Sequence, residues 1–238
     1  MPRKTTILQG PQSQRKKTKN HFNSSRNHTE QKAERTAVIH ADLHVHTTFS
    51  SDSTVLPKTL VQQLVTHSFI KVAAITDHDT TRGCNSTRQL ASAYPDILII
   101  PGTEISTPQG DVVLLGAEEM PPQPWTVENV VDFARERDLV SIVAHPYREY
   151  GMGDLARNYK VDAIEVLNGG SSPSANKSAQ ELARLMGLPG VGGSDAHQPA
   201  ELCTVYTDIQ ASMDIDDILK AIKKGLVSVP PMSKSIHF

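Results

Sequence analysis

The 238-residue sequence has few of the features that indicate a secreted, disulfide-bonded or membrane protein. It contains two cysteines, Cys84 and Cys203, which lie far apart and lack the CxxC spacing of a zinc ribbon. Aromatic residues make up 5% of the chain, and no apolar run approaches the roughly 20 residues that a transmembrane helix requires. The first residues lack the apolar segment of a signal peptide. We therefore expect a cytoplasmic protein that does not bind a membrane, with both cysteines buried as small apolar residues.

The formal net charge of −2 conceals two regions of opposite sign. Residues 1–35 contain nine Lys and Arg and two acidic residues, which leaves fifteen basic and twenty-four acidic residues in the remainder. The first 36 residues also show no apolar periodicity, so we expect a disordered basic tail followed by a domain over residues 37–238. We favour a simple solvated tail. Because basic tails attract polyanions, nucleic-acid binding by this segment is the alternative.

Short apolar runs alternate with amphipathic stretches from residue 37 onward. The pattern predicts strands at 38–46, 71–76, 97–100, 112–115, 140–144, 163–167, 190–192 and 204–207. It predicts helices at 57–69, 81–94, 126–137, 174–186 and 215–223. Alternation of apolar strands with helices is typical of parallel strands covered by helices, in a barrel or an open α/β sheet.

Polar side chains that can bind metals lie where the predicted strands end. His44 and His46 are spaced i, i+2 and therefore share one face of the first strand. The others are Asp77, His78, Asp79, Glu104, His145, Asp195 and His197. Active sites of α/β proteins form at the carboxyl ends of strands, because the loops there converge.

Each of these residues also has an ordinary structural interpretation. An Asp at a strand end is often the N-cap of the next helix, and a single His is more often a packed side chain than a ligand. Five of the ten histidines nevertheless follow this pattern, which is unlike a chance distribution. Imidazole and carboxylate donors without thiolates favour Zn²⁺, Mn²⁺ or Fe²⁺.

Five motifs, in this order, resemble those of the PHP family, named after polymerase and histidinol phosphatase. They are Asp42-Leu43-His44-Val45-His46-Thr47, Ile75-Thr76-Asp77-His78-Asp79, Gly102-Thr103-Glu104-Ile105-Ser106, Ala144-His145-Pro146 and Gly193-Ser194-Asp195-Ala196-His197. The resemblance implies a distorted (β/α)7 barrel with a trinuclear metal site that hydrolyses phosphate esters.

The resemblance also implies how two to three divalent ions are held. His44, His46, Glu104 and Asp195 would bind the first ion. Glu104 would bridge to a second ion bound by His145, and Asp52, His78 and His197 would bind a third. Many family members have a histidine where this chain has Asp111, so Asp111 is expected to complete the second site with a harder oxygen donor.

The expected activity is hydrolysis of a small phosphate ester by metal-activated water, which needs no Ser or Cys nucleophile. Arg148 is expected to bind a phosphate, Asn168 to orient substrate or a ligand, and Asp42 and Asp79 to fix histidine tautomers. The alternatives are an exonuclease, a non-catalytic metal-binding module and an amidohydrolase-type barrel. The last class expects a bridging lysine where this chain has Glu104.

Overall fold

The computed structural model describes residue 2 and residues 37–231. The predicted disordered tail at 1–36, apart from Pro2, and the end of the predicted domain at 232–238 therefore lie outside the described residues.

Ten strands, five α-helices and two short 3-10 helices are described between residues 37 and 231. The strands are β1 (Val38–Val45), β2 (Ile70–Ile75), β3 (Leu98–Ile100), β4 (Gly102–Thr107), β5 (Gly110–Leu115), β6 (Val140–Val143), β7 (Ala163–Asn168), β8 (Gly190–Gly193), β9 (Thr207–Gln210) and β10 (Val227–Ser228). The helices are α1 (Pro57–Thr66), α2 (Arg82–Ala91), α3 (Val127–Glu136), η1 (Gly153–Asn158), α4 (Pro173–Met186), η2 (Pro199–Glu201) and α5 (Ile215–Lys223).

The strands form two five-stranded sheets, ordered β10-β9-β1-β2-β3 and β4-β5-β6-β7-β8. Neighbours β1-β2-β3 and β6-β7-β8 are parallel, whereas β4-β5-β6 and β1-β9-β10 are antiparallel. The sheets are joined by the isolated bridges Val45–Ala196 and His78–Glu104. The expected distorted (β/α)7 barrel is therefore not confirmed: the described strands make two open sheets, because no continuous ladder joins β3 to β4 or β8 to β9.

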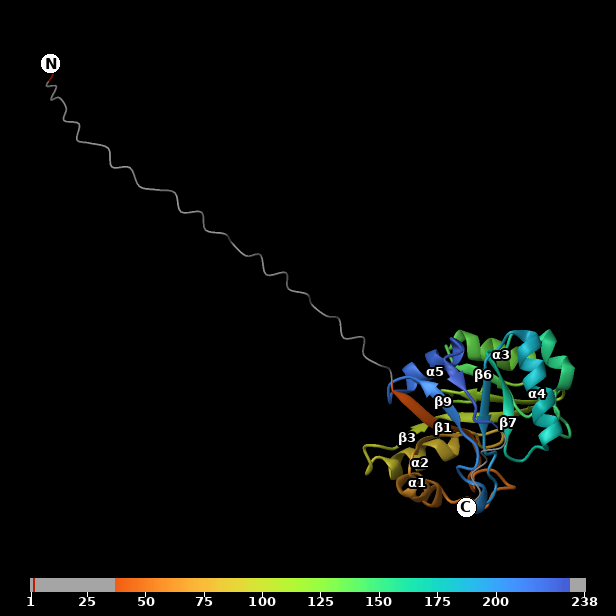
Figure 1. Ribbon diagram of the computed structural model, residues 1–238, viewed down its shortest axis with the longest axis horizontal. Coiled ribbons are helices and arrows are strands. Elements are labelled where there is room, and N and C mark those ends of the chain that lie inside the picture. Colours follow the sequence, from red (N-terminus) through yellow and green to blue (C-terminus); the bar gives the residue numbers. More distant parts are fainter. Residues whose placement is uncertain (1, 3–36, 232–238) are drawn as a thin grey trace. The chain divides into compact units, whose positions relative to one another are not determined.

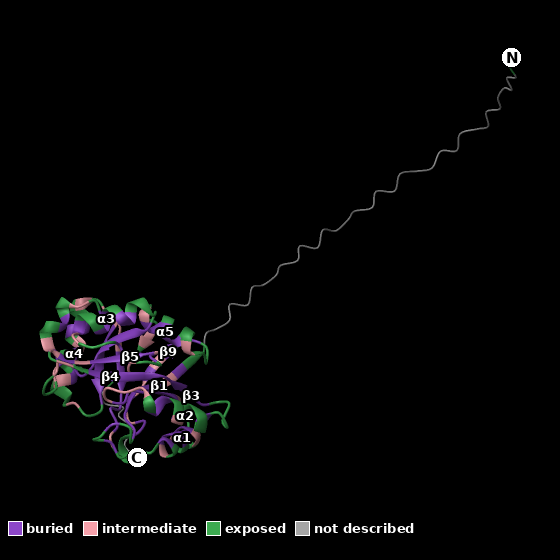
Figure 2. Ribbon diagram, turned by 180° about the vertical axis from the view of Figure 1, so that it is seen from behind, coloured by how far each residue is buried: buried purple, intermediate pink, exposed green. Residues whose placement is uncertain are grey.

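Apolar side chains of both sheets fill the space between them. This core includes Leu43 of β1, Val113 of β5, Ile142 of β6 and Val191 of β8, and α5 contributes Ile218 to it. Helices α1 and α2 pack together beside β3 on the first sheet, and α3 and α4 lie over the second sheet (Figure 1). Their outer faces are exposed while the strands are buried (Figure 2). The helices thus leave the strand ends open to form a site.

Capping residues explain where two of the predicted helices begin. Ser172 accepts a hydrogen bond from Ala175 N at the start of α4, and Asp214 accepts one from Asp217 N at the start of α5. Helix α4 ends at Gly187, whose φ of 64° is the left-handed conformation that glycine adopts without strain. The predicted helix at 215–223 is confirmed, and the prediction of 174–186 differs from α4 by one residue.

The strands of the structure differ in places from those predicted. The strand predicted at 97–100 is found as β3, but Pro101 separates it from β4, a second strand that carries Glu104, since proline fixes φ and lacks the N–H of a strand ladder. The prediction of a strand at 204–207 is wrong by three residues, because β9 begins at Thr207. The two-residue strand β10 was not predicted, since so short a segment has no readable period.

Candidate metal centre

Four buried side chains form the first donor group: His44 of β1, His46 directly after it, Glu104 of β4 and Asp195 after β8. His44 Nε2 lies 3.1 Å from His46 Nε2, 3.1 Å from Glu104 Oε2 and 3.4 Å from Asp195 Oδ1. His46 Nε2 lies 3.2 Å from Glu104 Oε2 and 3.1 Å from Asp195 Oδ1. Donors about 2.0–2.2 Å from a tetrahedral ion lie roughly 3.3–3.6 Å apart, which is close to these distances. The first group can therefore surround one cation.

Neighbouring charges shift the pKa values of these buried side chains and outweigh the effect of burial. Burial alone would lower the pKa of His44, but the carboxylates of Glu104, Asp195 and Glu165 hold it well above its usual range. At His46 burial is likewise outweighed, and hydrogen bonds to Asp195 and Glu104 raise the pKa to about 9. Burial would raise the pKa of Glu104, yet the neighbouring histidines hold it well below its usual range. Protons and a metal ion therefore compete for the same lone pairs.

The second donor group consists of Glu104, Asp111 and His145. His145 Nε2 lies 2.9 Å from Glu104 Oε1, whereas Glu104 Oε2 lies beside His44 Nε2. One oxygen of Glu104 therefore faces the second group and the other faces the first. Asp111 is the second residue of β5. Because β5 runs antiparallel to β6, its first residues lie beside His145, and Asp111 O accepts from Ala144 N at 3.2 Å. Burial and the nearby Glu104 raise the pKa of Asp111. The structure thus brings Asp111 to the position expected from the resemblance.

The third donor group contains His78 and His197, together with His46 of the first group. Asp52 Oδ2 lies 3.5 Å from His78 Nε2 and 3.3 Å from His197 Nε2. The Asp52 side chain is 51% exposed, whereas His78 and His197 are 30% and 22% exposed. The nine predicted ligand residues therefore lie in three neighbouring groups, linked by the shared side chains of Glu104 and His46.

Buried polar atoms without a good hydrogen bond gather at this cluster, which is compatible with a cation among the donors. Among the described residues, four buried side-chain atoms lack a hydrogen bond of good geometry, and three of them are His78 Nδ1, His145 Nδ1 and Asp195 Oδ1. Two of these atoms have neighbours that lie close without aligning: Asp195 Oδ1 is 3.1 Å from His46 Nε2, and His78 Nδ1 is 3.4 Å from Glu104 Oε2. A buried polar atom without a partner costs about 1–3 kcal/mol, so their concentration at one place calls for a compensating ligand. His145 and Asp195 also have positive φ angles of 26° and 53°. Such strained backbone in residues other than glycine is typical of functional sites.

Two buried residues that support the histidines were not singled out from the sequence. Glu165 of β7 lies 3.0 Å through Oε1 from His44 Nδ1, and Ser50 Oγ lies 3.2 Å from His46 Nδ1. These contacts occupy Nδ1 of each ring and direct Nε2 toward the other donors. A glutamate within the apolar run Ala163–Asn168 is the feature that could have identified Glu165.

Three aspartates near the site bind backbone amides rather than histidine rings. Asp42 accepts from Ser194 N at 2.8 Å, Asp77 from Thr47 N at 2.6 Å and Asp79 from Ser106 N at 2.9 Å. The prediction that Asp42 and Asp79 fix histidine tautomers is therefore wrong. The alternative that Asp79 caps a helix is also wrong, since Thr81 precedes α2. These carboxylates instead join the loops that carry the donors, because buried N–H groups need acceptors.

Arg148 and Asn168 lie at the edge of the first group. An Nη1 of Arg148 donates to Asp195 Oδ2, and Asn168 Nδ2 donates to the same oxygen at 3.2 Å. The Arg148 side chain is 39% exposed, and Asp195 keeps its Oδ1 directed toward His44 and His46. Arg148 is thus anchored beside the donors by one of its five N–H groups, which leaves others able to bind an anion.

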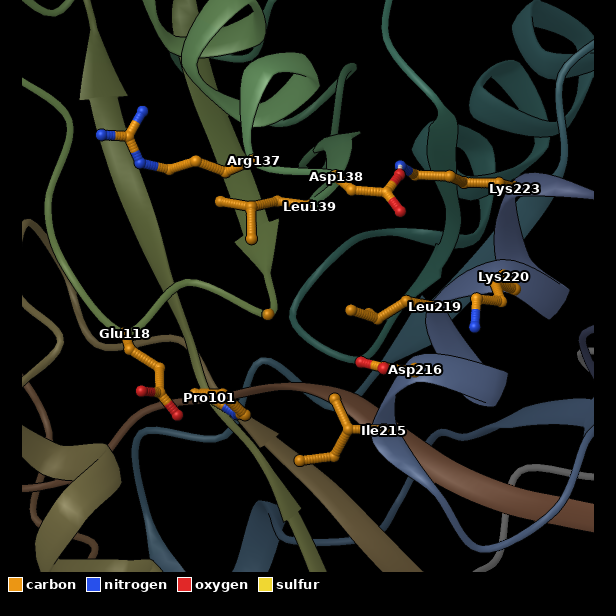
Figure 3. Close-up of a pocket in the computed structure, with 11 residues that line it drawn as sticks. Pro101, Glu118, Arg137, Asp138, Leu139, Ile215, Asp216, Leu219, Lys220 and Lys223 are labelled. Carbon is orange, nitrogen blue, oxygen red and sulfur yellow. Dashed lines mark hydrogen bonds and ion pairs between the residues drawn. The ribbon is translucent and has the colours of Figure 1, made fainter.

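A cavity of about 470 Å³ lies at the opposite ends of β4, β5 and β6 (Figure 3). Pro101, Gly116 and Leu139 contribute to its walls, together with Leu219 of α5. Charged side chains surround these apolar walls, and Lys223 forms an ion pair with Asp138 at 2.5 Å. None of the nine clustered residues lines this cavity, so it is separate from the candidate metal centre.

Comparisons with known proteins identify similar sequences and folds. Residues 173–227 match a family described as PHP-associated. An uncharacterised protein of Methanocaldococcus jannaschii is 30% identical over 140 residues, which are 54% of this chain and 81% of that protein. The 5'-3' exoribonuclease Rnm of Salmonella typhimurium is 47% identical over 72 residues, which are 30% of this chain and only 24% of the relative.

Among solved structures, the fold is similar to that of a two-domain protein from Bacteroides vulgatus that contains a predicted PHP-like metal-dependent phosphoesterase. The TM-score is 0.70 at 19% identity, over 82% of this chain and 65% of the other. The chain thus carries a match to the PHP-associated family over residues 173–227, and its mixed α/β fold is similar to that of PHP-like metal-dependent phosphoesterases.

Two further expectations can be compared with the described residues. No described lysine forms an ion pair with the donor groups, and Glu104 stands where an amidohydrolase-type site would have its bridging lysine. The donor set therefore disfavours that alternative. Among the helices described here, none is long and apolar enough to cross a membrane.

Proposed function

We propose that this protein hydrolyses a small phosphate ester with water activated by two to three divalent metal ions. The observation that carries the proposal is the linkage of three donor groups through Glu104 and His46. A shared carboxylate holds two ions close together, which is the arrangement that two-metal phosphoesterases use.

Each donor group has a defined part in this proposal. His44, His46, Glu104 and Asp195 hold the first ion; Glu104, Asp111 and His145 hold the second; Asp52, His78 and His197 hold the third. When bound, such ions lower the pKa of water to roughly 7 and neutralise charge on phosphoryl oxygens. The nitrogen and oxygen donors, without thiolate, favour Mn²⁺, Fe²⁺ or Zn²⁺, and the carboxylate of Asp111 favours the harder ions at the second group.

Arg148 contributes the substrate contact in this proposal. Its guanidinium is held at the edge of the first group by Asp195, and its remaining N–H groups suit the oxygens of a phosphate. The two cysteines do not supply a nucleophile, because both are buried and burial raises the pKa of Cys84 to about 11. Water is thus the nucleophile that the site supports.

An exonuclease is the second candidate, because the Salmonella relative named as a 5'-3' exoribonuclease shares 47% identity over 72 residues. The excess of acidic residues after residue 35 favours a small substrate instead, since an extended nucleic-acid groove draws affinity from Lys and Arg. The two activities differ in their products, because an exonuclease releases nucleotides while a phosphatase releases inorganic phosphate.

The test combines metal analysis with substrate screening on the full chain. Metal-depleted protein is titrated with Mn²⁺ or Zn²⁺ and assayed on nucleoside mono- and bisphosphates, histidinol phosphate and short oligonucleotides. We expect two to three bound ions per chain and phosphate release that His44→Ala abolishes. His40→Ala is the matched control, because His40 lies on the same strand but pairs with Asp208 away from the donors. A folded protein that binds neither metal contradicts the proposal.

A further inference from the structure

Glu165 is a charged residue in an otherwise uncharged strand and is 3% exposed. Both of its oxygens are used: Oε1 lies 3.0 Å from His44 Nδ1, and Oε2 accepts from His145 N at 2.8 Å and from Asn168 Nδ2 at 3.0 Å. It belongs to none of the three donor groups. Its contacts nevertheless reach residues of the first and second groups at the same time.

The chemistry of these three contacts requires a carboxylate. Donors face Glu165 on both sides, since His145 offers a backbone N–H, Asn168 an amide N–H and His44 its Nδ1 proton. A carboxylate accepts on both sides, whereas a glutamine offers one acceptor and one NH₂ donor. In Glu165→Gln, the NH₂ group therefore faces either the Nδ1 proton of His44 or the N–H groups of His145 and Asn168, so that donors oppose each other on that side. The size and shape of the side chain hardly change.

The contacts explain the orientation of both histidines. With Nδ1 of His44 donating to Glu165, the lone pair of His44 Nε2 is directed at His46, Glu104 and Asp195. His145 has a φ of 26°, a conformation that needs external support, and its N–H is held by Glu165 Oε2. That support places His145 Nε2 at 2.9 Å from Glu104 Oε1.

We propose that Glu165 is a positioning residue that couples the first and second donor groups, so that binding of both ions depends on this one carboxylate. The inference rests on the proposed function, because it concerns the ions of that site. Asn168 extends the coupling, since its Nδ2 contacts both Glu165 Oε2 and Asp195 Oδ2.

The test is the metal affinity of Glu165→Gln, measured with Zn²⁺ and Mn²⁺ against a competing chelator. Loss of a partner that orients a metal ligand costs roughly 10–100-fold in metal affinity. We expect a loss in this range for the ions of both the first and the second donor group. Glu181→Gln is the matched control, because Glu181 is exposed on α4 and pairs with Arg184. The metal affinity of this variant should equal that of the wild-type protein.

The outcomes separate this inference from the proposed function. If the wild-type protein binds metal and the folded Glu165→Gln variant binds it with unchanged affinity, the coupling by Glu165 is overturned and the proposed function is not. A change in thermal stability of the variant does not alter this conclusion. A purely structural role would lower the melting temperature of the metal-free protein without changing its affinity. If Glu165→Gln does not fold, Glu165→Asp is measured in its place, since the shorter carboxylate cannot reach both His44 and His145. Unchanged metal affinity of Glu165→Asp would likewise overturn the coupling. Wild-type protein that binds no metal overturns both proposals.

Discussion

The first and third donor groups share His46 and both combine histidines with carboxylates, but they differ in their exposure to water. The four side chains of the first group are at most 5% exposed, whereas Asp52 of the third group is 51% exposed. Water can solvate the exposed carboxylate, but a buried charge needs a protein or metal partner. If both groups hold ions as proposed, this difference in burial predicts that the ion of the first group is held more tightly than that of the third.

The largest effect is expected when the buried group loses a carboxylate. Asp195→Ala removes a first-group donor and the anchor of Arg148. We expect activity to fall by more than the roughly 100-fold that loss of an outer partner can cost, with one metal equivalent lost. Phosphate release and elemental analysis measure both. Asp208→Ala, which affects a pair outside the cluster, is the control, and retention of full activity by Asp195→Ala would refute the assignment of the first group.

Asp111 tests the second group, which is intermediate in burial. Asp111→Ala should reduce Mn²⁺-supported activity by at least roughly tenfold, the lower range for disturbed metal ligation. Asp111→His replaces an oxygen donor by imidazole and should raise the ratio of Zn²⁺-supported to Mn²⁺-supported activity. Asp96→His, at an exposed position beside Lys71, serves as the control. An unchanged metal ratio in Asp111→His would mean that residue 111 does not contact the second ion.

The exposed third group should tolerate substitution better. Asp52→Asn keeps the size of the side chain and removes its charge, and we expect a loss of at most roughly tenfold that excess Mn²⁺ restores. Activity as a function of Mn²⁺ concentration measures this effect. A loss as large as that of Asp195→Ala, insensitive to added metal, would show that exposure does not distinguish the two groups.

The smallest effect is expected at the far ends of the strands. Arg137 lines the cavity of Figure 3, pairs with Glu119 and lies 4.0 Å from the centre of the Phe133 ring. Arg137→Ala should leave activity and metal content unchanged and lower the free energy of unfolding by about 1 kcal/mol or less. Chemical denaturation measures the second quantity. A tenfold loss of activity would mean that the two ends of the strands are coupled.

Short-range patterns in the sequence were sufficient for most of the elements. Apolar periodicity located α3, α4 and α5 to within about a residue at each end, because amphipathic helices of this length carry several turns of pattern. The split of β3 and β4 at Pro101 was readable in principle, since proline interrupts a ladder. The arrangement of the strands in two sheets was not readable, because pairing between distant strands leaves no local period.

The sequence by itself indicated which side chains carry candidate metal donors, since donor type and order along the chain are local properties, and the structure brings all nine of these side chains together. Tertiary structure alone decided how they are shared. The antiparallel course of β5 brings Asp111 to His145, and the packing of β7 beside the donors turns Glu165 into a partner of His44. Burial and hydrogen bonding arise only when distant segments meet, and they establish the proton affinities and orientations on which the proposed chemistry depends.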